Sequence, residues 1–248
     1  MKQKRCSPTH RINEPRITSQ EDSVKEADMR NKFDEQLKKL NDEMIQMGVM
    51  IEENIQEAID ALAKADVKRA AEIMERDVLI DQKQRDIEGL CFQLLIQQQP
   101  VAKDLRAITA AMKMVTDMER IGDRAPDISE ITILLADTER TAGYDTIIRM
   151  ASEASVMLMQ SVDAFTEKDE QKARKVIEHD DVVDDLFSRV KTELVEIIRE
   201  DPKRGEQEID MLMIAKYLER IGDHATNIAE WVIYSLDHTG TQALQKTQ

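Results

Sequence analysis

The sequence ERIGDRAPDI runs from Glu119 to Ile128, and its first five letters return in LERIGDHATNIAEWVIY, Leu218 to Tyr234. In each copy an oxygen-bearing side chain recurs every four positions, and the third place of the pattern is taken by Asp127 in the first copy and by Asn227 in the second. Because four residues make about one helical turn, these side chains share one face of a helix. The pattern predicts two similar helices, each with an acidic stripe.

The chain around these two helices is duplicated as well. Apolar residues recur at steps of three and four, which is the helical period, while Gly (7) and Pro (5) are scarce. Landmarks that recur at offsets of 100 to 103 residues are Asp77 with Asp180, Asp81 with Asp184, Pro100 with Pro202, and Glu119 with Glu219. Such a nearly constant spacing indicates an internal repeat. It predicts an all-α fold of two tandem, pseudo-symmetric antiparallel three-helix bundles.

Helix breakers and caps predict the boundaries. We expect a first helix of about thirty residues from Phe33, with Asp66 as the N-cap of the next, and further helices at about 67–98, 101–137, 144–167, 170–200 and 206–238. The first bundle then covers 29–140 and the second 141–238, separated near Gly143. Residues 1–28 have mixed charge and little apolar pattern, which predicts a disordered extension, and 239–248 are expected to form a flexible tail.

Composition excludes several classes of protein. The net charge of −15 and the pI near 4.8 argue against a nucleic-acid-binding protein, which would need a basic face. The two cysteines, Cys6 and Cys91, cannot build a disulfide framework or a cysteine-rich zinc site. The sequence contains no apolar run long enough for a membrane span and no apolar core of a secretory signal. These features predict a cytoplasmic protein without a transmembrane segment.

The two acidic stripes predict a metal site. An isolated acidic helix face is usually only solvated, but here the same register is kept twice, and Arg120 and Arg220 point about 100° away from the preceding Glu. Carboxylate and amide oxygens suit hard or borderline divalent cations, although the residues do not select one metal. Small residues beside each stripe allow a neighbouring helix, with acids of its own, to approach. The candidate ligands are Glu119, Asp123, Asp127, Glu219, Asp223 and Asn227, joined by Asp77, Asp81, Asp180 and Asp184. His179 and His224 are expected to be surface residues instead of ligands.

Pro126 departs from the repeat, because the second copy has Thr226 at this place. A proline inside a helix removes a hydrogen bond and crowds the carbonyl four residues before it, which belongs to Gly122. We therefore expect a kink between Gly122 and Asp127 that turns Asp127 away from its stripe.

Taken together, these segments resemble the PhoU family of phosphate-signalling proteins. The resemblance runs from about Met29 to Asp237 and rests on FDEQLKKL (33–40), QPVAKDLRAI (99–108) and the two ERIGD helices. It implies a negative regulator of phosphate uptake and of the phosphate-starvation response, which is not an enzyme. It also implies a homodimer that links the ATPase subunit of a phosphate ABC transporter to a phosphate-sensing histidine kinase. Iron, zinc, manganese or magnesium on the acidic motifs is part of the same expectation.

An enzymatic alternative stays open beside this interpretation. The same carboxylates could serve a metal-dependent phosphohydrolase or a di-metal redox protein. Against it, the sequence contains no P-loop, no GxGxxG and no HExxH motif. The paired Glu-x-x-His segments of di-iron four-helix proteins are absent too.

Overall fold

The computed structural model describes residues 18–97, 100–138 and 143–237, and within these ranges it contains helices and no strand. This confirms the predicted all-α fold. The helices are α1 (Thr18–Lys64), α2 (Val67–Gln97), α3 (Ala102–Gly122), α4 (Arg124–Leu134), α5 (Tyr144–Glu167), α6 (Glu170–Glu200) and α7 (Gly205–Leu236), with a short 3₁₀ turn, η1 (Pro202–Arg204), before α7. None of the helices in the described ranges is long and apolar enough to cross a membrane.

Caps fix two of the helix starts where the sequence predicts them. The Asp66 carboxylate accepts a hydrogen bond from the backbone N–H of Arg69 at 3.0 Å, at the start of α2. In the second repeat, Asp169 accepts from the N–H groups of Gln171 and Lys172 at 2.9 and 3.0 Å, at the start of α6. These side chains satisfy helix N–H groups that have no partner inside the helix.

The first helix begins earlier than predicted. We expected a disordered extension up to residue 28, but α1 starts at Thr18. The stretch from Arg16 to Met47 contains neither Gly nor Pro, so nothing in it stops a helix that the bundle stabilises further along. Residues 1–17 and the tail after Asp237 lie outside the described residues, so those two predictions remain open.

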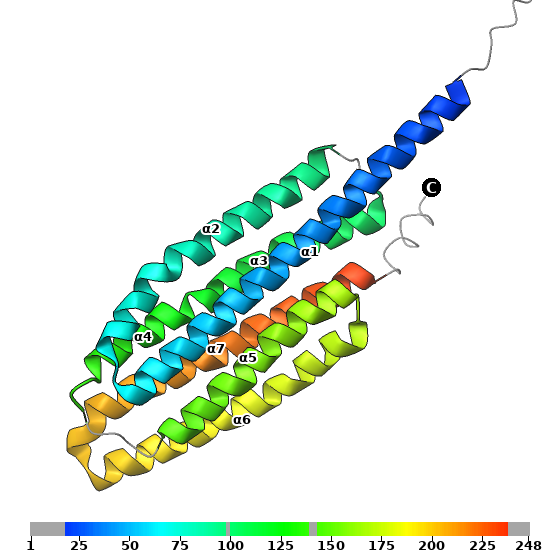
Figure 1. The fold of residues 1–248 in the computed structure, drawn as a ribbon. Helices are drawn as coiled ribbons and strands as arrows, with labels where there is room; N and C mark the ends of the chain where they lie inside the picture. Colours follow the sequence, from blue (N-terminus) through cyan, green and yellow to red (C-terminus); the bar gives the residue numbers. More distant parts are fainter. Residues whose placement is uncertain (1–17, 98–99, 139–142, 238–248) are drawn as a thin grey trace, which may run out of the picture.

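The helices form two trios that pack side by side (Figure 1). α1, α2 and α3–α4 make the first trio, and α5, α6 and α7 make the second. The trios meet through α1 against α5 and through α3–α4 against α7, whereas α2 and α6 lie at opposite edges of the bundle. Among the described helices, each edge helix therefore packs on helices of its own repeat alone.

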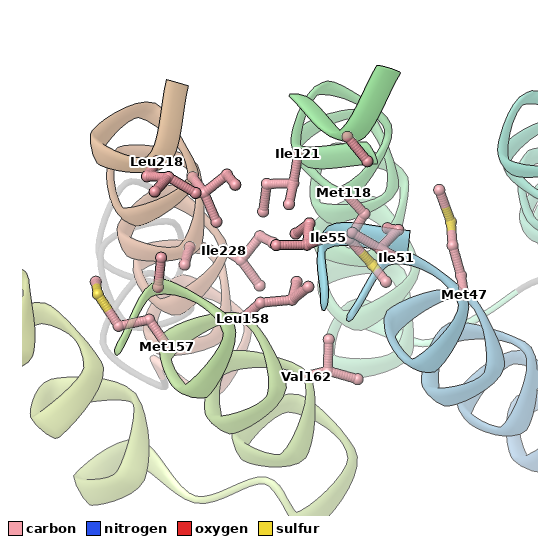
Figure 2. Close-up of a cluster of buried hydrophobic side chains, with 14 of the residues drawn as sticks. Met47, Ile51, Ile55, Met118, Ile121, Met157, Leu158, Val162, Leu218 and Ile228 are labelled. Carbon is pink, nitrogen blue, oxygen red and sulfur yellow. The ribbon is translucent and has the colours of Figure 1, made fainter. Parts of the chain in front are cut away.

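One apolar core runs through both repeats. Figure 2 shows side chains from four helices meeting between them: Ile51 and Ile55 from α1, Met118 and Ile121 from α3, Leu158 and Val162 from α5, Leu218 and Ile228 from α7. All of them are at most 1% exposed. The apolar part of the interface between the trios is thus as deeply buried as the interior of each trio.

The structure interrupts the third predicted helix where a kink was expected, but Asp127 is not turned away from its stripe, because its charge still raises the pKa values of Asp77 and Asp123. The third predicted helix is interrupted at Asp123, so that α3 ends at Gly122 and α4 begins at Arg124. Pro126 has no N–H to donate to the Gly122 carbonyl, whereas the N–H of Asp127 still lies 3.3 Å from the carbonyl of Asp123. In the second repeat α7 runs on without a break.

Replacing Pro126 by Thr, the residue of the second repeat, is expected to stabilise the protein. The substitution restores the missing donor, and an interior proline costs a helix about 3 kcal/mol, so a gain of about 1 to 2 kcal/mol in the free energy of unfolding should remain after α3 and α4 adjust. Urea denaturation measures it. Thr226→Pro is the matched control and should lower the free energy of unfolding by about 3 kcal/mol. An unchanged stability in Pro126→Thr would show that the break has another cause.

Candidate metal centre

The first acidic cluster lies where α2 packs against α3 and α4. Asp77 and Asp81 come from α2, Glu119 from α3, and Asp123 from the break between α3 and α4. Burial raises the pKa of Asp77, and the charges of Asp123, Asp81 and Asp127 raise it further. The two helices thus bring together carboxylates that are far apart in the sequence, as predicted.

Burial and mutual repulsion shape the rest of this cluster. The pKa of Glu119 is raised by burial and then by the charges of Asp123 and Asp81. The pKa of Asp123 is raised by burial, although Arg124 offsets part of the effect. One oxygen of Asp77, Oδ1, is buried without a hydrogen-bond partner. A buried carboxylate oxygen without a donor is costly, and a cation beside it would remove that cost.

The second cluster repeats this arrangement between α6 and α7. Burial raises the pKa of Asp180 to about 6, and the charges of Asp184, Asp223 and Glu219 add to the effect. Lys216 forms an ion pair with Glu219 and lies over the Phe187 ring, 5.5 Å from its centroid. One predicted ligand is therefore already paired with a cation.

Two glycines let the helices of each cluster approach. A Cβ on Gly122 would be 2.8 Å from Cγ2 of Ile80, which is 1% exposed. A Cβ on Gly222 would be 3.0 Å from Oδ1 of Asp180. The glycine of each ERIGD motif thus sets the distance between its acidic stripe and the acids of the edge helix.

Gly122→Ala is expected to destabilise the protein by about 1 to 2 kcal/mol. The new methyl group clashes with buried Ile80, and the free energy that this clash costs exceeds the gain in helix propensity from replacing Gly by Ala. Gly222→Ala should change stability less, since a carboxylate can rotate away. Gly48→Ala is the control: its Cβ would meet only ordinary contacts at 3.5 Å, so it should stabilise by about 0.5 to 1 kcal/mol. Thermal unfolding ranks the three, and a Gly122→Ala protein as stable as Gly48→Ala would contradict the tight packing.

The third residue of each stripe has another partner. Asp127 forms an ion pair with Arg124 at 2.6 Å, yet it stays close enough to raise the pKa of Asp77. Asn227 points to the other repeat, since its amide nitrogen lies 3.4 Å from Oδ1 of Asp117 on α3. Whether Asp127 and Asn227 are ligands therefore stays a prediction.

Polar contacts between the two repeats were not predicted. His224 and Asp117 are hydrogen-bonded, with Nδ1 and Oδ1 2.9 Å apart. At the equivalent place of the other repeat, the Arg124 guanidinium lies over the ring of Tyr217, 5.5 Å from its centroid. Tyr217 is the counterpart of Asp117, and His224 is the counterpart of Arg124, each 100 residues later in the sequence. The two contacts therefore occupy equivalent places of the two repeats. His224 was expected at the surface, but its side chain is only 16% exposed.

The donor set fits a hard or borderline cation. Each cluster contains carboxylates from two helices. In the first cluster, Oδ1 of Asp77 is buried and accepts no hydrogen bond, so it is available to coordinate a cation. Among the residues that the structure describes, no three His, Cys, Asp or Glu side chains are already placed so that they could hold one ion.

Comparisons with known proteins agree with this architecture. The family model described as PhoU domain matches residues 44–132 and 147–232, one match in each repeat. A Clostridium acetobutylicum protein named phosphate-specific transport system accessory protein PhoU homolog is 39% identical over 211 residues, which cover 85% of this chain and 95% of that protein. A Pseudomonas aeruginosa protein of the same name is 34% identical over 87% of this chain and 90% of its own length.

Two crystal structures share the fold. PhoU from Pseudomonas aeruginosa superposes with a TM-score of 0.77 at 35% identity, over 82% of this chain and 98% of that one. The phosphate transport system regulatory protein PhoU from Streptococcus pneumoniae superposes with a TM-score of 0.75 at 27% identity, over 82% and 96%.

Proposed function

The chain belongs to the PhoU family, and from that premise we propose that it is a cytoplasmic negative regulator of phosphate uptake and of the phosphate-starvation response. As a family member it is an accessory protein of a phosphate transport system. Its relatives are named for accessory or regulatory roles and not for a catalysed reaction, which favours a protein that works by binding.

The proposed mechanism is a metal-dependent scaffold that acts as a homodimer. Long helical faces contact the ATPase subunit of the phosphate ABC transporter and the phosphate-sensing histidine kinase. The observation that carries the proposal is the pair of acidic clusters, in which Asp77 and Asp180 have raised pKa values because burial and neighbouring carboxylates disfavour their charge. Iron, zinc, manganese or magnesium would bind there after rotation of the carboxylates and offset the repulsion. The acidic surface then becomes compatible with a partner.

Phosphate itself is not expected to bind these side chains. Phosphate is an anion, and a cluster of carboxylates repels it. A metal ion held by Asp77, Asp123 and their neighbours would offset part of the local negative charge and offer phosphate oxygens a positive centre to coordinate. The signal of phosphate abundance would then reach the scaffold only in its metal-loaded form.

A binding experiment tests the proposal. The full chain with Glu119, Asp123, Glu219 and Asp223 all changed to Ala is compared with wild type for capture of the purified ATPase subunit and kinase, with manganese present. The control changes four exposed acids on the edge helices, Asp86, Asp185, Glu196 and Glu200, so that the net charge changes equally. We expect the cluster variant to lose at least about tenfold in affinity, since both metal sites are removed, and the control to bind as wild type. Equal binding by both variants would refute a metal-dependent scaffold.

The enzymatic alternative has its own test. Purified protein loaded with manganese, magnesium or iron is incubated with a generic phosphomonoester. The scaffold proposal expects no turnover above that of Asp223→Ala. Turnover that Asp223→Ala abolishes would favour the phosphohydrolase.

A further inference from the structure

The outward face of the edge helix α2 is apolar along most of its length. With Asp77 as origin and 100° per residue, eight residues fall within a stripe from about 60° to about 120°. We call it the α2 stripe; its members are Val67, Ala71, Met74, Val78, Arg85, Gly89, Phe92 and Ile96. Val78, Phe92 and Ile96 are 63%, 52% and 78% exposed, although they are large and apolar. Arg85 is the only charged member.

The second repeat provides an internal control for this stripe. α6 occupies the equivalent edge of the other trio, and it packs on its own two neighbours as α2 does. At the equivalent positions of α6, 103 residues later, four of the eight residues are charged: Glu170, Arg174, Asp181 and Arg199. The fold is therefore compatible with a polar outward face. The apolar residues of α2 need a reason other than the packing of the bundle.

We propose that the α2 stripe pairs with the α2 stripe of a second copy of this chain, antiparallel, about a two-fold axis between Asp81 and Gln82. In that register the numbers of facing residues add up to 163, and in two of the four facing pairs a large residue meets Ala or Gly. Val67 faces Ile96, Ala71 faces Phe92, Met74 faces Gly89, and Val78 faces Arg85. A single apolar stripe thus supplies both sides of an isologous interface. This inference gives the interface of the homodimer proposed above and rests on that part of the proposal alone.

The small members of the stripe have room for the large ones. Apart from the adjoining backbone of α2 itself, no described atom lies within 4 Å of a Cβ built on Gly89. Gly89 also borders a cavity of about 380 Å³ between α1 and α2, together with Lys39, Glu43 and Leu90. Met74 of the second copy would pack over Gly89, and Met is the side chain that fills irregular gaps most readily. The cavity beside Gly89 would stay hydrated, since Arg85, Asp86 and Gln93 line it as well.

Charge and size agree with this pairing. Arg85 lies 3.7 Å from Asp81 of its own chain. Across the two-fold axis it would be about 4.5 Å along the helix from Asp81 of the second copy, within reach of its guanidinium. The stripe is about 44 Å long, and a helix pair of that length buries on the order of 1,000 Å², which is the lower limit for a specific interface. Figure 1 shows α2 at the edge of the bundle, where no other helix of the described ranges covers its outer side.

Oligomeric state tests the surface. Light scattering and sedimentation on the full chain should show a dimer for wild type, and Phe92→Glu should raise its dissociation constant by about 30-fold or more, because it places a charge in the middle of each apolar half. Val195→Glu is the matched control: it changes the equivalent, 47% exposed residue of α6 and should leave the dimer intact. Circular dichroism verifies that both variants are folded. A monomeric wild type at 100-micromolar-scale concentration, or an intact Phe92→Glu dimer, overturns the proposal.

Disulfide trapping tests the register. In a Cys6→Ala background, with buried Cys91 left in place, Val67→Cys and Ile96→Cys proteins are oxidised separately and as a mixture. The antiparallel register predicts covalent dimers only in the mixture. Covalent dimers that form from the Val67→Cys protein alone overturn the proposal. The proposal is also overturned if the wild-type protein is monomeric and Phe92→Glu instead abolishes capture of the transporter ATPase subunit. Manganese uptake by Phe92→Glu is measured in parallel, so that failure of the interface and failure of the metal sites are told apart.

Discussion

Leu158→Ala is expected to lower the free energy of unfolding by about 4 kcal/mol, and the melting temperature by about 10 °C for a chain of this size. Leu158 is fully buried on α5, and Figure 2 shows it among side chains from the other repeat as well as its own. Truncation removes apolar contacts with both trios and leaves a cavity that long, regular helices cannot collapse to fill.

The same variant distinguishes one folding unit from two. Because the core is shared, calorimetry of wild type and of Leu158→Ala should show a single transition that moves as a whole. Leu134→Ala is the control, since Leu134 is 65% exposed and its truncation should change stability by less than about 0.5 kcal/mol. Two transitions, of which Leu158→Ala moved only the second, would mean that the repeats fold independently and only dock.

The repeat architecture could be predicted because its signals are local. The acidic step of four, the apolar steps of three and four, and the cap Asp66 all act within one helix, and each is where the sequence indicates it. The interruption at Asp123 is local too, since Pro126 acts on the carbonyl four residues before it. The start of α1 was missed because a polar stretch such as 18–28 has no apolar pattern of its own, and its helix is continued from a part that the bundle stabilises.

Contacts between the repeats could not be predicted in the same way. Asp117 and His224 are 107 positions apart, and only the packing of α3 against α7 brings them to 2.9 Å. Helical periodicity predicts contacts between residues three or four positions apart, and it predicts nothing for two residues 107 positions apart. In contrast, the meeting of Asp77 with Asp123 was predictable, because Gly122 marks the place where the edge helix can approach. The size of the pKa shifts of Asp77 and Asp180 could not be predicted from the sequence, because their largest cause is burial, which depends on how closely the helices pack.

If the clusters bind metal as proposed, removal of two acids from either cluster should weaken manganese uptake at that cluster by about 100-fold or more, because half of its proposed anionic ligands are lost. One variant changes Asp77 and Asp123 to Asn, and the other changes Asp180 and Asp223 to Asn. Calorimetric titration of each should show one site lost and the other kept. Asp86→Asn with Asp185→Asn is the control, because it removes the same charge from exposed positions on the edge helices. Loss of uptake in the control would mean that net charge, and not the clusters, attracts the ion.

Acid should have the same effect as these substitutions, and the direction can be worked out for Asp180. Its pKa is raised to about 6, so the carboxylate is mostly ionised at pH 7.5 and mostly protonated at pH 5. A metal ion competes with that proton, and uptake by the second cluster should therefore fall as the pH drops through 6. Without metal the sign for stability is reversed: the folded protein holds this proton more tightly than the unfolded chain, so its stabilising effect is present below about pH 4 and is lost as the pH rises through 6. Asp180→Asn should abolish this contribution to both pH dependences, because an amide does not titrate in this range. If uptake in wild type is unchanged between pH 7.5 and 5, Asp180 is not a ligand, and the second cluster must bind through Glu219 and Asp223 alone or not at all.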